Sequence, residues 1–195
     1  MAKRGHLPVH MGAEEFSQLL AALHALAPRY CLEWGSGGST RAVLEQCPFI
    51  QRYVSIEHEQ SWYERVRAQV TDPRLELHLA PPAVPLPPRS RLTSRRRRWD
   101  AHAELDRSAL QRYIDLPAGL GVCFDFVLVD GRARRFCLSA GWQLLRPGGL
   151  LVLHDAQRPQ YRDVLCSLGR PAFLEPWHQG QIALLRKPES SGEST

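Results

Sequence analysis

The sequence predicts a single α/β domain in which a seven-stranded, mostly parallel sheet lies between two layers of helices. Short apolar segments alternate with amphipathic segments along most of the chain, as expected when helices connect parallel strands. The strongest apolar segment, 124–131, is a nearly continuous run, which is typical of a strand buried on both faces. The chain has 195 residues and 44% hydrophobic content, which suits one domain with a sizeable core.

Helical spacing of apolar residues predicts helices over 13–26, 40–46, 61–70, 104–114, 134–145 and 160–168. The first helix is expected to end before Pro28, and Ser61 is expected to cap the start of the third. Trp62, Tyr63 and Trp142 occupy helical positions, so we expect their rings to lie in the core.

Strands are predicted over 30–34, 52–57, 75–79, 124–131, 150–154, 173–174 and 181–186. A Pro-Gly-Gly turn at 147–149 separates the fifth predicted helix from strand 150–154. The last two strands are too close in sequence for a crossover helix, so we expect them to be antiparallel.

A segment at about 81–103 interrupts this pattern. Five prolines lie between Pro81 and Pro88, and six arginines follow within 89–98. Prolines break regular structure and arginines bury little surface, so we predict an irregular surface insertion that is mobile unless a ligand orders it. The domain is expected to span 1–187, with a disordered tail at 188–195.

The net charge of +5 invites a nucleic-acid interpretation, but its origin is local. Without the six arginines the basic count falls from 25 to 19, against 20 acidic residues, a balance of −1. Only Trp99 adjoins the cluster, whereas surfaces that bind single-stranded nucleic acid combine basic and aromatic residues. A solvated loop is the favoured interpretation; a lid over an acceptor and a binding site for an anionic polymer are the alternatives.

The five cysteines are scattered and contain no CxxC pair, which indicates reduced thiols rather than a disulfide framework or a zinc site. No apolar run is long enough to cross a membrane, and no secretory signal is visible at the N-terminus. We therefore expect a cytoplasmic protein without a membrane partner.

The first predicted strand runs into a glycine loop and then a helix, in the order Glu33-Trp34-Gly35-Ser36-Gly37-Gly38-Ser39-Thr40. Such a loop lets a ligand approach the backbone. Glu57 ends the next strand, 22 residues after Gly35, where an acid can accept hydrogen bonds from a ribose. Thr40 stands where a dinucleotide fingerprint has Gly or Ala, and the charge of Glu33 suits a cationic ligand better than a pyrophosphate. These features favour S-adenosyl-L-methionine (SAM) over NAD.

Four segments, 33–40, 55–58, 124–131 and 144–152, resemble in this order the motifs of class I SAM-dependent methyltransferases. The resemblance covers about 30–186 without the insertion. It implies a Rossmann-like three-layer sandwich with an antiparallel last strand. It also implies a cofactor site made of Glu33, Gly35, Ser36, Gly37, Gly38, Ser39, Glu57, His58 and Asp130. Ala80 and Pro81, after the third strand, occupy positions that frame the adenine in this family.

A finer resemblance, to metal-dependent O-methyltransferases and to methyltransferases of small sugar acceptors, rests on Asp130 and Asp155. It implies that these acids hold Mg²⁺ or another divalent cation and that His154 or Asp155 removes a proton from the acceptor. The alternative is that both acids only cap the following helices, in a metal-independent enzyme. Arginines near these acids are candidates for binding an anionic acceptor: Arg132, Arg135 and Arg158.

The predicted function is SAM-dependent methyl transfer to a hydroxyl group of a small or sugar-like acceptor. Two other classes of function stay open at this stage. One is an NAD-binding oxidoreductase, and the other is a non-catalytic Rossmann-like domain that binds nucleic acid through its arginines.

Overall fold

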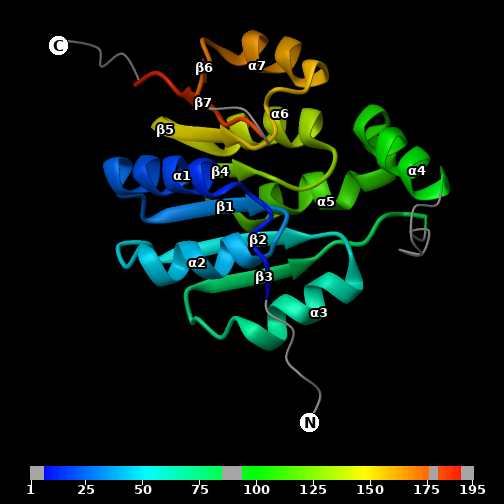
Figure 1. Cartoon of the computed structure of the whole chain (residues 1–195), viewed down its shortest axis with the longest axis horizontal. Helices are drawn as coiled ribbons and strands as arrows, with labels where there is room; N and C mark the ends of the chain where they lie inside the picture. The colour runs from blue at the N-terminus through cyan, green and yellow to red at the C-terminus, as the bar shows by residue number, and fades with distance from the viewer. Residues whose placement is uncertain (1–6, 85–93, 176–179, 190–195) are drawn as a thin grey trace.

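The computed structural model describes residues 7–84, 94–175 and 180–189. Within these ranges, seven strands form one sheet in the order β3-β2-β1-β4-β5-β7-β6 (Figure 1). Their bounds are β1 Tyr30–Trp34, β2 Arg52–Glu57, β3 Leu75–Leu79, β4 Phe124–Val129, β5 Leu145–Leu153, β6 Ala172–Phe173 and β7 Ala183–Arg186. The first five strands pair in parallel, and β7 is antiparallel to both β5 and β6. The predicted sheet, including its reversed strand, is confirmed.

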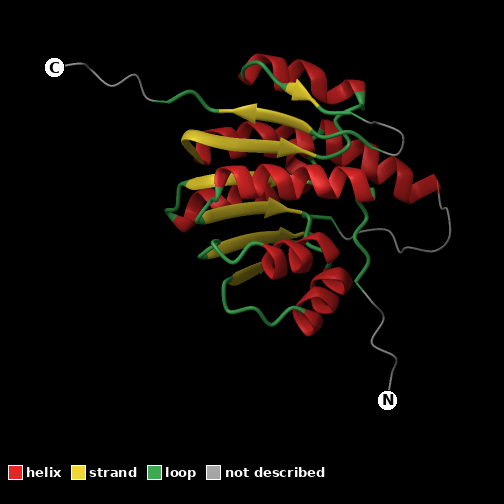
Figure 2. Ribbon diagram, turned by 60° about the vertical axis from the view of Figure 1, so that its left-hand side comes forward, coloured by secondary structure: helices red, strands yellow, loops and turns green. Residues whose placement is uncertain are grey.

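Helices cover both faces of the sheet (Figure 2). The α-helices are α1 Ala13–Leu26, α2 Gly38–Gln46, α3 Gln60–Gln69, α4 Ser94–Leu105, α5 Gln111–Asp115, α6 Arg134–Leu144 and α7 Arg162–Leu168. Short 3₁₀ helices are η1 Arg107–Leu110, η2 Leu116–Leu120 and η3 Pro159–Tyr161. Residues of α1 to α3 pack on one face, and residues of α4 to α7 pack on the other. This is the three-layer arrangement that the alternating pattern predicted.

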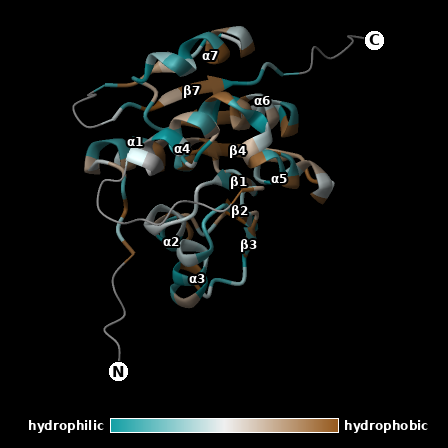
Figure 3. Ribbon diagram, turned by 90° about the vertical axis from the view of Figure 1, so that its right-hand side faces the viewer, coloured by the Kyte–Doolittle hydropathy of each residue, from teal (hydrophilic) through white to brown (hydrophobic). Residues whose placement is uncertain are grey.

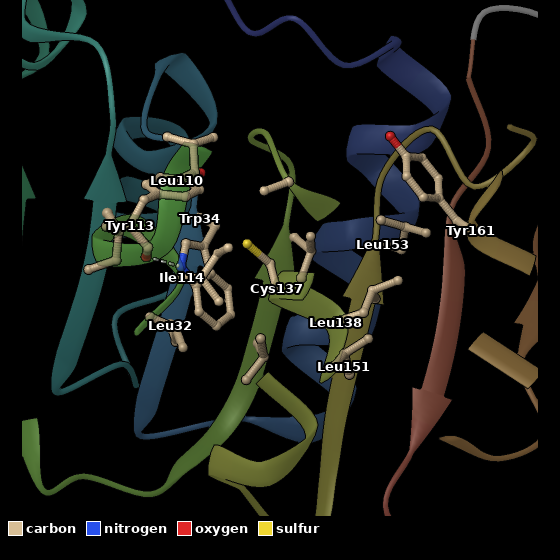
Figure 4. Close-up of a cluster of buried hydrophobic side chains, with 14 of the residues drawn as sticks. Leu32, Trp34, Leu110, Tyr113, Ile114, Cys137, Leu138, Leu151, Leu153 and Tyr161 are labelled. Carbon is tan, nitrogen blue, oxygen red and sulfur yellow. Dashed lines mark hydrogen bonds between the residues drawn. The ribbon is translucent and has the colours of Figure 1, made fainter. Parts of the chain in front are cut away.

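Successive residues of the central strand β4 point to opposite faces and so belong to two different hydrophobic cores. Val127 belongs to the core under α5 and α6, which also contains Trp34 (labelled in Figure 4), whereas Phe126 and Leu128 belong to the core under α1 and α2. The Trp34 indole Nε1 donates a hydrogen bond to the Tyr113 carbonyl oxygen at 2.9 Å, which satisfies its one buried donor. Figure 3 shows strands β4 and β7 as hydrophobic segments between helices with hydrophilic surfaces.

Helix α1 has the predicted bounds, because both of its ends are defined locally. The Gly12 amide donates to Glu15 Oε2 at 2.9 Å at the start, and Ala27 adopts a left-handed conformation at the end, with φ of 47°. Strand β5 begins at Leu145, earlier than predicted. Leu145 already pairs with Phe124 of β4, and the turn that contains Gly148 then shifts the register of the pairing before Leu150.

Helix α4 corrects the prediction of an irregular insertion. Residues 94–105 are helical, whereas residues 85–93 lie outside the described part of the chain. The prediction extended the effect of the prolines too far. The last of the five prolines in this segment is Pro88, and arginine itself is a good helix former. The predicted helix 104–114 is instead divided into α4, η1 and α5, since Asp106 accepts a hydrogen bond from the Ser108 amide and caps η1.

Helix α3 begins at Gln60, so the prediction that Ser61 caps it is wrong. Ser61 Oγ instead donates to Glu59 Oε1 at 3.0 Å. Trp62, Tyr63 and Trp142 are half-buried rather than core residues. Trp62 and Trp142 pack against the two cores as partly buried residues, a distinction that helical spacing cannot make.

The structure has free cysteines, of which Cys31, Cys47 and Cys137 are buried and Cys123 and Cys166 are exposed. Among the described residues, no helix combines the length and apolarity required to cross a membrane. The cytoplasmic location stays a prediction. Residues 190–195 of the predicted tail lie outside the described ranges.

Candidate active site

A cavity of about 250 Å³ opens at the carboxyl ends of the central strands. It lies where the strand order reverses, between β1 and β4, which is where ligands bind in open α/β sheets. All the residues predicted to bind the cofactor or a metal, or to act in catalysis, line this cavity except Glu33. They are Gly35, Ser36, Gly37, Gly38, Ser39, Glu57, His58, Asp130, His154 and Asp155. Segments from four strands therefore meet in one site.

The glycine loop is held by close backbone contacts. Gly35 has φ of +101°, and a Cβ there would lie 2.7 Å from the Gly131 Cα, so the loops after β1 and β4 touch. At Gly38 a Cβ would lie 2.5 Å from the Pro8 carbonyl oxygen. The N-terminal segment 7–12 thus lies against the start of α2 and adds Pro8 and His10 to the cavity wall. No signal in the sequence indicated these two residues.

Glu33 lies beneath the loop, fully buried, and not in the cavity wall. Its carboxyl group accepts hydrogen bonds from Thr40 Oγ1 at 2.6 Å, Ser55 Oγ at 2.8 Å and Ser39 Oγ at 3.3 Å. Burial raises the pKa of Glu33 to about 8, against the lowering effect of the hydroxyl groups of Thr40 and Ser55. The raised pKa favours the neutral form of Glu33 beneath the loop, and the predicted contact of its charge with a cationic ligand stays a prediction.

Thr40 explains why the loop departs from a dinucleotide fingerprint. Its hydroxyl donates to Glu33 and accepts a hydrogen bond from the Gly37 amide at 2.8 Å. Thr40 thus joins the loop to the buried carboxyl group, a role that Gly or Ala cannot perform. This departure supports the preference for SAM over NAD.

Glu57 is oriented by its neighbours. Its Oε1 accepts hydrogen bonds from the amides of His58 and Glu59, both at 2.8 Å, and its Oε2 accepts one from Ser36 Oγ at 3.1 Å. The sequence placed Glu57 at an open strand end, but the residue is only 3% exposed. It still lines the cavity, and a carboxylate has lone pairs beyond these three bonds for the hydroxyl groups of a ligand.

The rings of His58 and Trp62 also line this side of the cavity. The His58 ring is parallel to the Trp99 ring of α4, with centroids 6.0 Å apart, and its buried Nε2 has no hydrogen-bond partner among the described residues. A polar atom in this position fits a ligand that contributes a hydrogen bond. Trp62 faces His10 with ring centroids 5.8 Å apart, and both line the cavity.

On the opposite side, His154 lies between two carboxylates. Its Nδ1 is 2.6 Å from Asp130 Oδ1, and its Nε2 is 3.4 Å from Glu15 Oε1. Burial by itself lowers the pKa of His154, but the hydrogen bond and negative charge of Asp130 outweigh this effect and raise the pKa above its usual value. The sequence did not indicate Glu15, because this residue comes from the first turn of α1, far away along the chain.

Arg134, at the start of α6, connects Asp130 with Asp155. Its Nη1 donates to Asp155 Oδ2 at 2.9 Å, and its Nη2 lies 3.4 Å from Asp130 Oδ1. Burial raises the pKa of Asp155, but Arg134, His154 and Arg158 together lower it below the usual value. Asp155 has φ of 60°, a left-handed conformation that is uncommon outside glycine and that Asp tolerates.

This arrangement does not fit a divalent cation. Magnesium requires free oxygen ligands, but the carboxylates of Asp130 and Asp155 already bind a guanidinium. Within the described ranges, no three His, Cys, Asp or Glu side chains form a group that could hold a metal ion. The described residues therefore do not support the predicted metal site at Asp130 and Asp155.

The three candidate arginines have separate positions. Arg132 lines the cavity, and its Nε lies 3.1 Å from Asp100 Oδ1. Arg135 pairs with Asp163 at 2.7 Å, and Arg158 pairs with Asp155 at 2.6 Å; neither is part of the wall. Ala80 and Pro81, after β3, are not part of the wall either.

The chain shares its fold, with this sheet order and the reversed β7, with solved methyltransferase structures. A methyltransferase-like protein from Silicibacter pomeroyi is 20% identical with a TM-score of 0.60, over 94% of this chain and 91% of that chain. An O-methyltransferase from Bacillus cereus, in complex with S-adenosylhomocysteine (SAH), is 14% identical with a TM-score of 0.61, over 93% and 84% of the chains. The N-methyltransferase NodS from Bradyrhizobium japonicum, also in complex with SAH, is 17% identical with a TM-score of 0.53, over 90% and 87%. No protein-family model and no curated protein sequence matches the chain.

Proposed function

We propose that the protein is a SAM-dependent methyltransferase that methylates a hydroxyl oxygen of a small or sugar-like acceptor. One observation carries the proposal: a single cavity at the switch point contains the glycine loop 35–39, the Glu57 carboxylate and the Asp130–His154 pair. The fold shared with methyltransferases solved with SAH supports it.

The cofactor side of the cavity consists of the loop and Glu57. The loop backbone offers amide groups to the methionine part of the ligand, and Glu57 offers acceptors to the two ribose hydroxyl groups. His58 Nε2, which has no hydrogen-bond partner among the described residues, is a further polar atom on this side.

The acceptor side consists of Asp130 and His154. When bound, SAM supplies an activated methyl group, so the protein has mainly to align the acceptor oxygen and take up its proton. His154 accepts this proton when it is neutral, and Asp130 fixes the orientation of its ring through Nδ1. Asp155 is the poorer base, because two arginines hold its carboxylate in the charged form.

The test is an isothermal titration of the purified protein with SAH, compared with the Glu57→Gln variant. We expect micromolar binding to the wild type. Glu57→Gln loses charge-assisted hydrogen bonds worth about 1.5–3 kcal/mol, so the affinity should fall about 10- to 100-fold. Glu45→Gln, an exposed change on α2, is the matched control and should bind like the wild type.

NADH is titrated in parallel, with nicotinamide fluorescence as the signal. Tight binding of NADH without binding of SAH would replace the proposal with an NAD-linked oxidoreductase. Binding of neither ligand to folded protein would favour a cofactor-free domain, and steeply salt-dependent RNA binding would then indicate the nucleic-acid alternative.

A further inference from the structure

We infer that the Arg134 guanidinium occupies the place of a divalent cation between Asp130 and Asp155, and that the site therefore works without a metal. Arg134 is thus a positioning residue of the acceptor side. The part of this inference that concerns metal binding stands on the geometry alone. The part that concerns catalysis rests on the proposed methyl transfer.

The guanidinium is held by several acceptors at the ends of β4 and β5. Besides the two carboxylates, Nε donates to the Gly131 carbonyl at 3.0 Å, Nη1 to the His154 carbonyl at 2.6 Å and Nη2 to the Asp130 carbonyl at 3.0 Å. The Arg134 side chain is only 5% exposed. A guanidinium with this many acceptors holds a fixed orientation.

The carboxylate oxygens that face Arg134, Asp155 Oδ2 and Asp130 Oδ1, each have a second partner. Asp155 Oδ2 also accepts a hydrogen bond from Arg158 Nη2 at 2.6 Å, and Asp130 Oδ1 lies 2.6 Å from His154 Nδ1. A dication bound between these two oxygens would have to displace Arg134 from both carboxylates and leave its buried charge with backbone carbonyls alone, which is unfavourable. Repulsion from Arg134 and Arg158 adds to this cost.

A guanidinium in place of a divalent cation changes how the acceptor hydroxyl group can lose its proton. A bound divalent cation could lower the pKa of an acceptor hydroxyl group, whereas Arg134 lines the cavity as a guanidinium, which has no open coordination position. Its bonds to the carbonyls of Asp130 and His154 instead hold the ends of β4 and β5 at a fixed separation. The Asp130–His154 pair keeps its alignment, and removal of the proton depends on His154.

The direct test measures Mn²⁺ binding by electron paramagnetic resonance, with no SAM or acceptor present. Wild type should show no saturable binding. Arg134→Gln removes the charge and should gain a site for Mn²⁺, which the additional change Asp155→Asn should abolish. Arg134→Lys keeps a positive charge and should not bind Mn²⁺, although it loses the planar hydrogen bonds of arginine. A purely structural role for Arg134 would not produce this difference between Gln and Lys.

The matched control is Arg135→Gln, one residue further along α6, where the arginine pairs with Asp163 outside the cavity. It should not gain Mn²⁺ binding. Saturable Mn²⁺ binding by the wild type that Asp155→Asn removes would overturn the inference. Arg134→Gln protein that is folded by circular dichroism and still binds no Mn²⁺ would overturn it as well.

A second measurement decides the matter if Arg134→Gln does not fold. The SAH affinity of the wild type is compared in magnesium and in a chelator, and the two values should agree within about twofold. A tenfold gain with magnesium would contradict the inference. Absence of SAH binding in both conditions would count against the proposed function, while the result of the Mn²⁺ experiment on the wild type would still decide the metal question.

Discussion

The buried carboxyl group of Glu33 makes the base of the glycine loop sensitive to pH. Its raised pKa means that the folded protein keeps a proton on Glu33 between the ordinary pKa of a glutamate and about 8, whereas the unfolded chain has lost it. The folded state binds more protons in this window, so this group contributes stability that is present at acidic pH. The contribution is lost as the pH rises through about 8.

Glu33→Gln should remove this dependence, because an amide cannot ionise. Each unit of raised pKa corresponds to about 1.4 kcal/mol, so the wild type should lose stability by up to a few kcal/mol between about pH 5 and pH 9. The variant should lose less. Urea denaturation over this range measures the difference in the free energy of unfolding.

Glu45→Gln is the control for this comparison, because Glu45 is exposed and pairs only with Arg41 on the same helix. Its pH dependence should match that of the wild type. If Glu33→Gln and the wild type lose stability in parallel as the pH rises, then Glu33 is ionised in the folded state and our interpretation of the loop is wrong.

At the scale of elements, the site depends on a contact between the N-terminal segment 7–12 and the first turn of α2. Leu7 and Met11 are buried in the core under α1 and α2, which anchors this segment on both sides of Pro8 and His10. The backbones approach so closely at Gly38 that no side chain fits between them. One wall of the cavity therefore exists only while this contact is made.

Gly38→Ala should weaken that contact. In an exposed helix the change from Gly to Ala adds up to about 1 kcal/mol of stability, but here the new Cβ would collide with the carbonyl groups of Pro8 and Leu7. We expect a net loss of about 1–3 kcal/mol and faster proteolysis near the N-terminus. Thermal unfolding and limited proteolysis with mass spectrometry measure the two effects.

Gly119→Ala in η2 is the matched control, because a Cβ there meets no atom within 4 Å. Its unfolding temperature and its cleavage pattern should stay close to those of the wild type. If Gly38→Ala were as stable as this control and equally resistant at the N-terminus, the segment 7–12 would not be packed against α2 in solution.

At the scale of the whole molecule, one sheet joins two hydrophobic cores. Leu128 of β4 lies in the core under α1 to α3, and Leu32 of the adjacent β1 lies in the core under α5 and α6. Both are fully buried. Because each core uses alternate residues of the same strands, loss of packing on one face should weaken the other face as well.

Leu128→Ala and Leu32→Ala should each lower the free energy of unfolding by about 2–5 kcal/mol. Both variants should unfold in one transition when followed by tryptophan fluorescence and by far-ultraviolet circular dichroism. Leu105→Ala, at a side chain that is 74% exposed, is the control and should change stability by less than about 0.5 kcal/mol. Separate transitions for the two probes would show that the two cores unfold independently.

The sequence by itself determined the elements of this protein whose signals are local. The bounds of α1, β1, β2 and β3 follow from the spacing of apolar residues and from nearby turn residues, which act within a few positions along the chain. The glycine loop and Glu57 were predicted for the same reason, because the strand-loop-helix order is itself a local pattern. The predicted irregular insertion extended too far, to about 103, because the effect of the prolines was carried beyond Pro88 into residues 94–103, which form part of α4.

Only the tertiary structure decided how the polar groups of the site pair. Glu15 meets His154 because α1 packs over the end of β5, and Arg134 meets Asp155 because β4 and β5 are neighbours in the sheet. The environment of Glu33 likewise depends on hydroxyl groups from α2 and β2. Burial and charge pairing depend on residues that are distant in sequence. The sequence pattern of Asp130 and Asp155 therefore fits metal ligands, and only the tertiary structure shows that both contact Arg134.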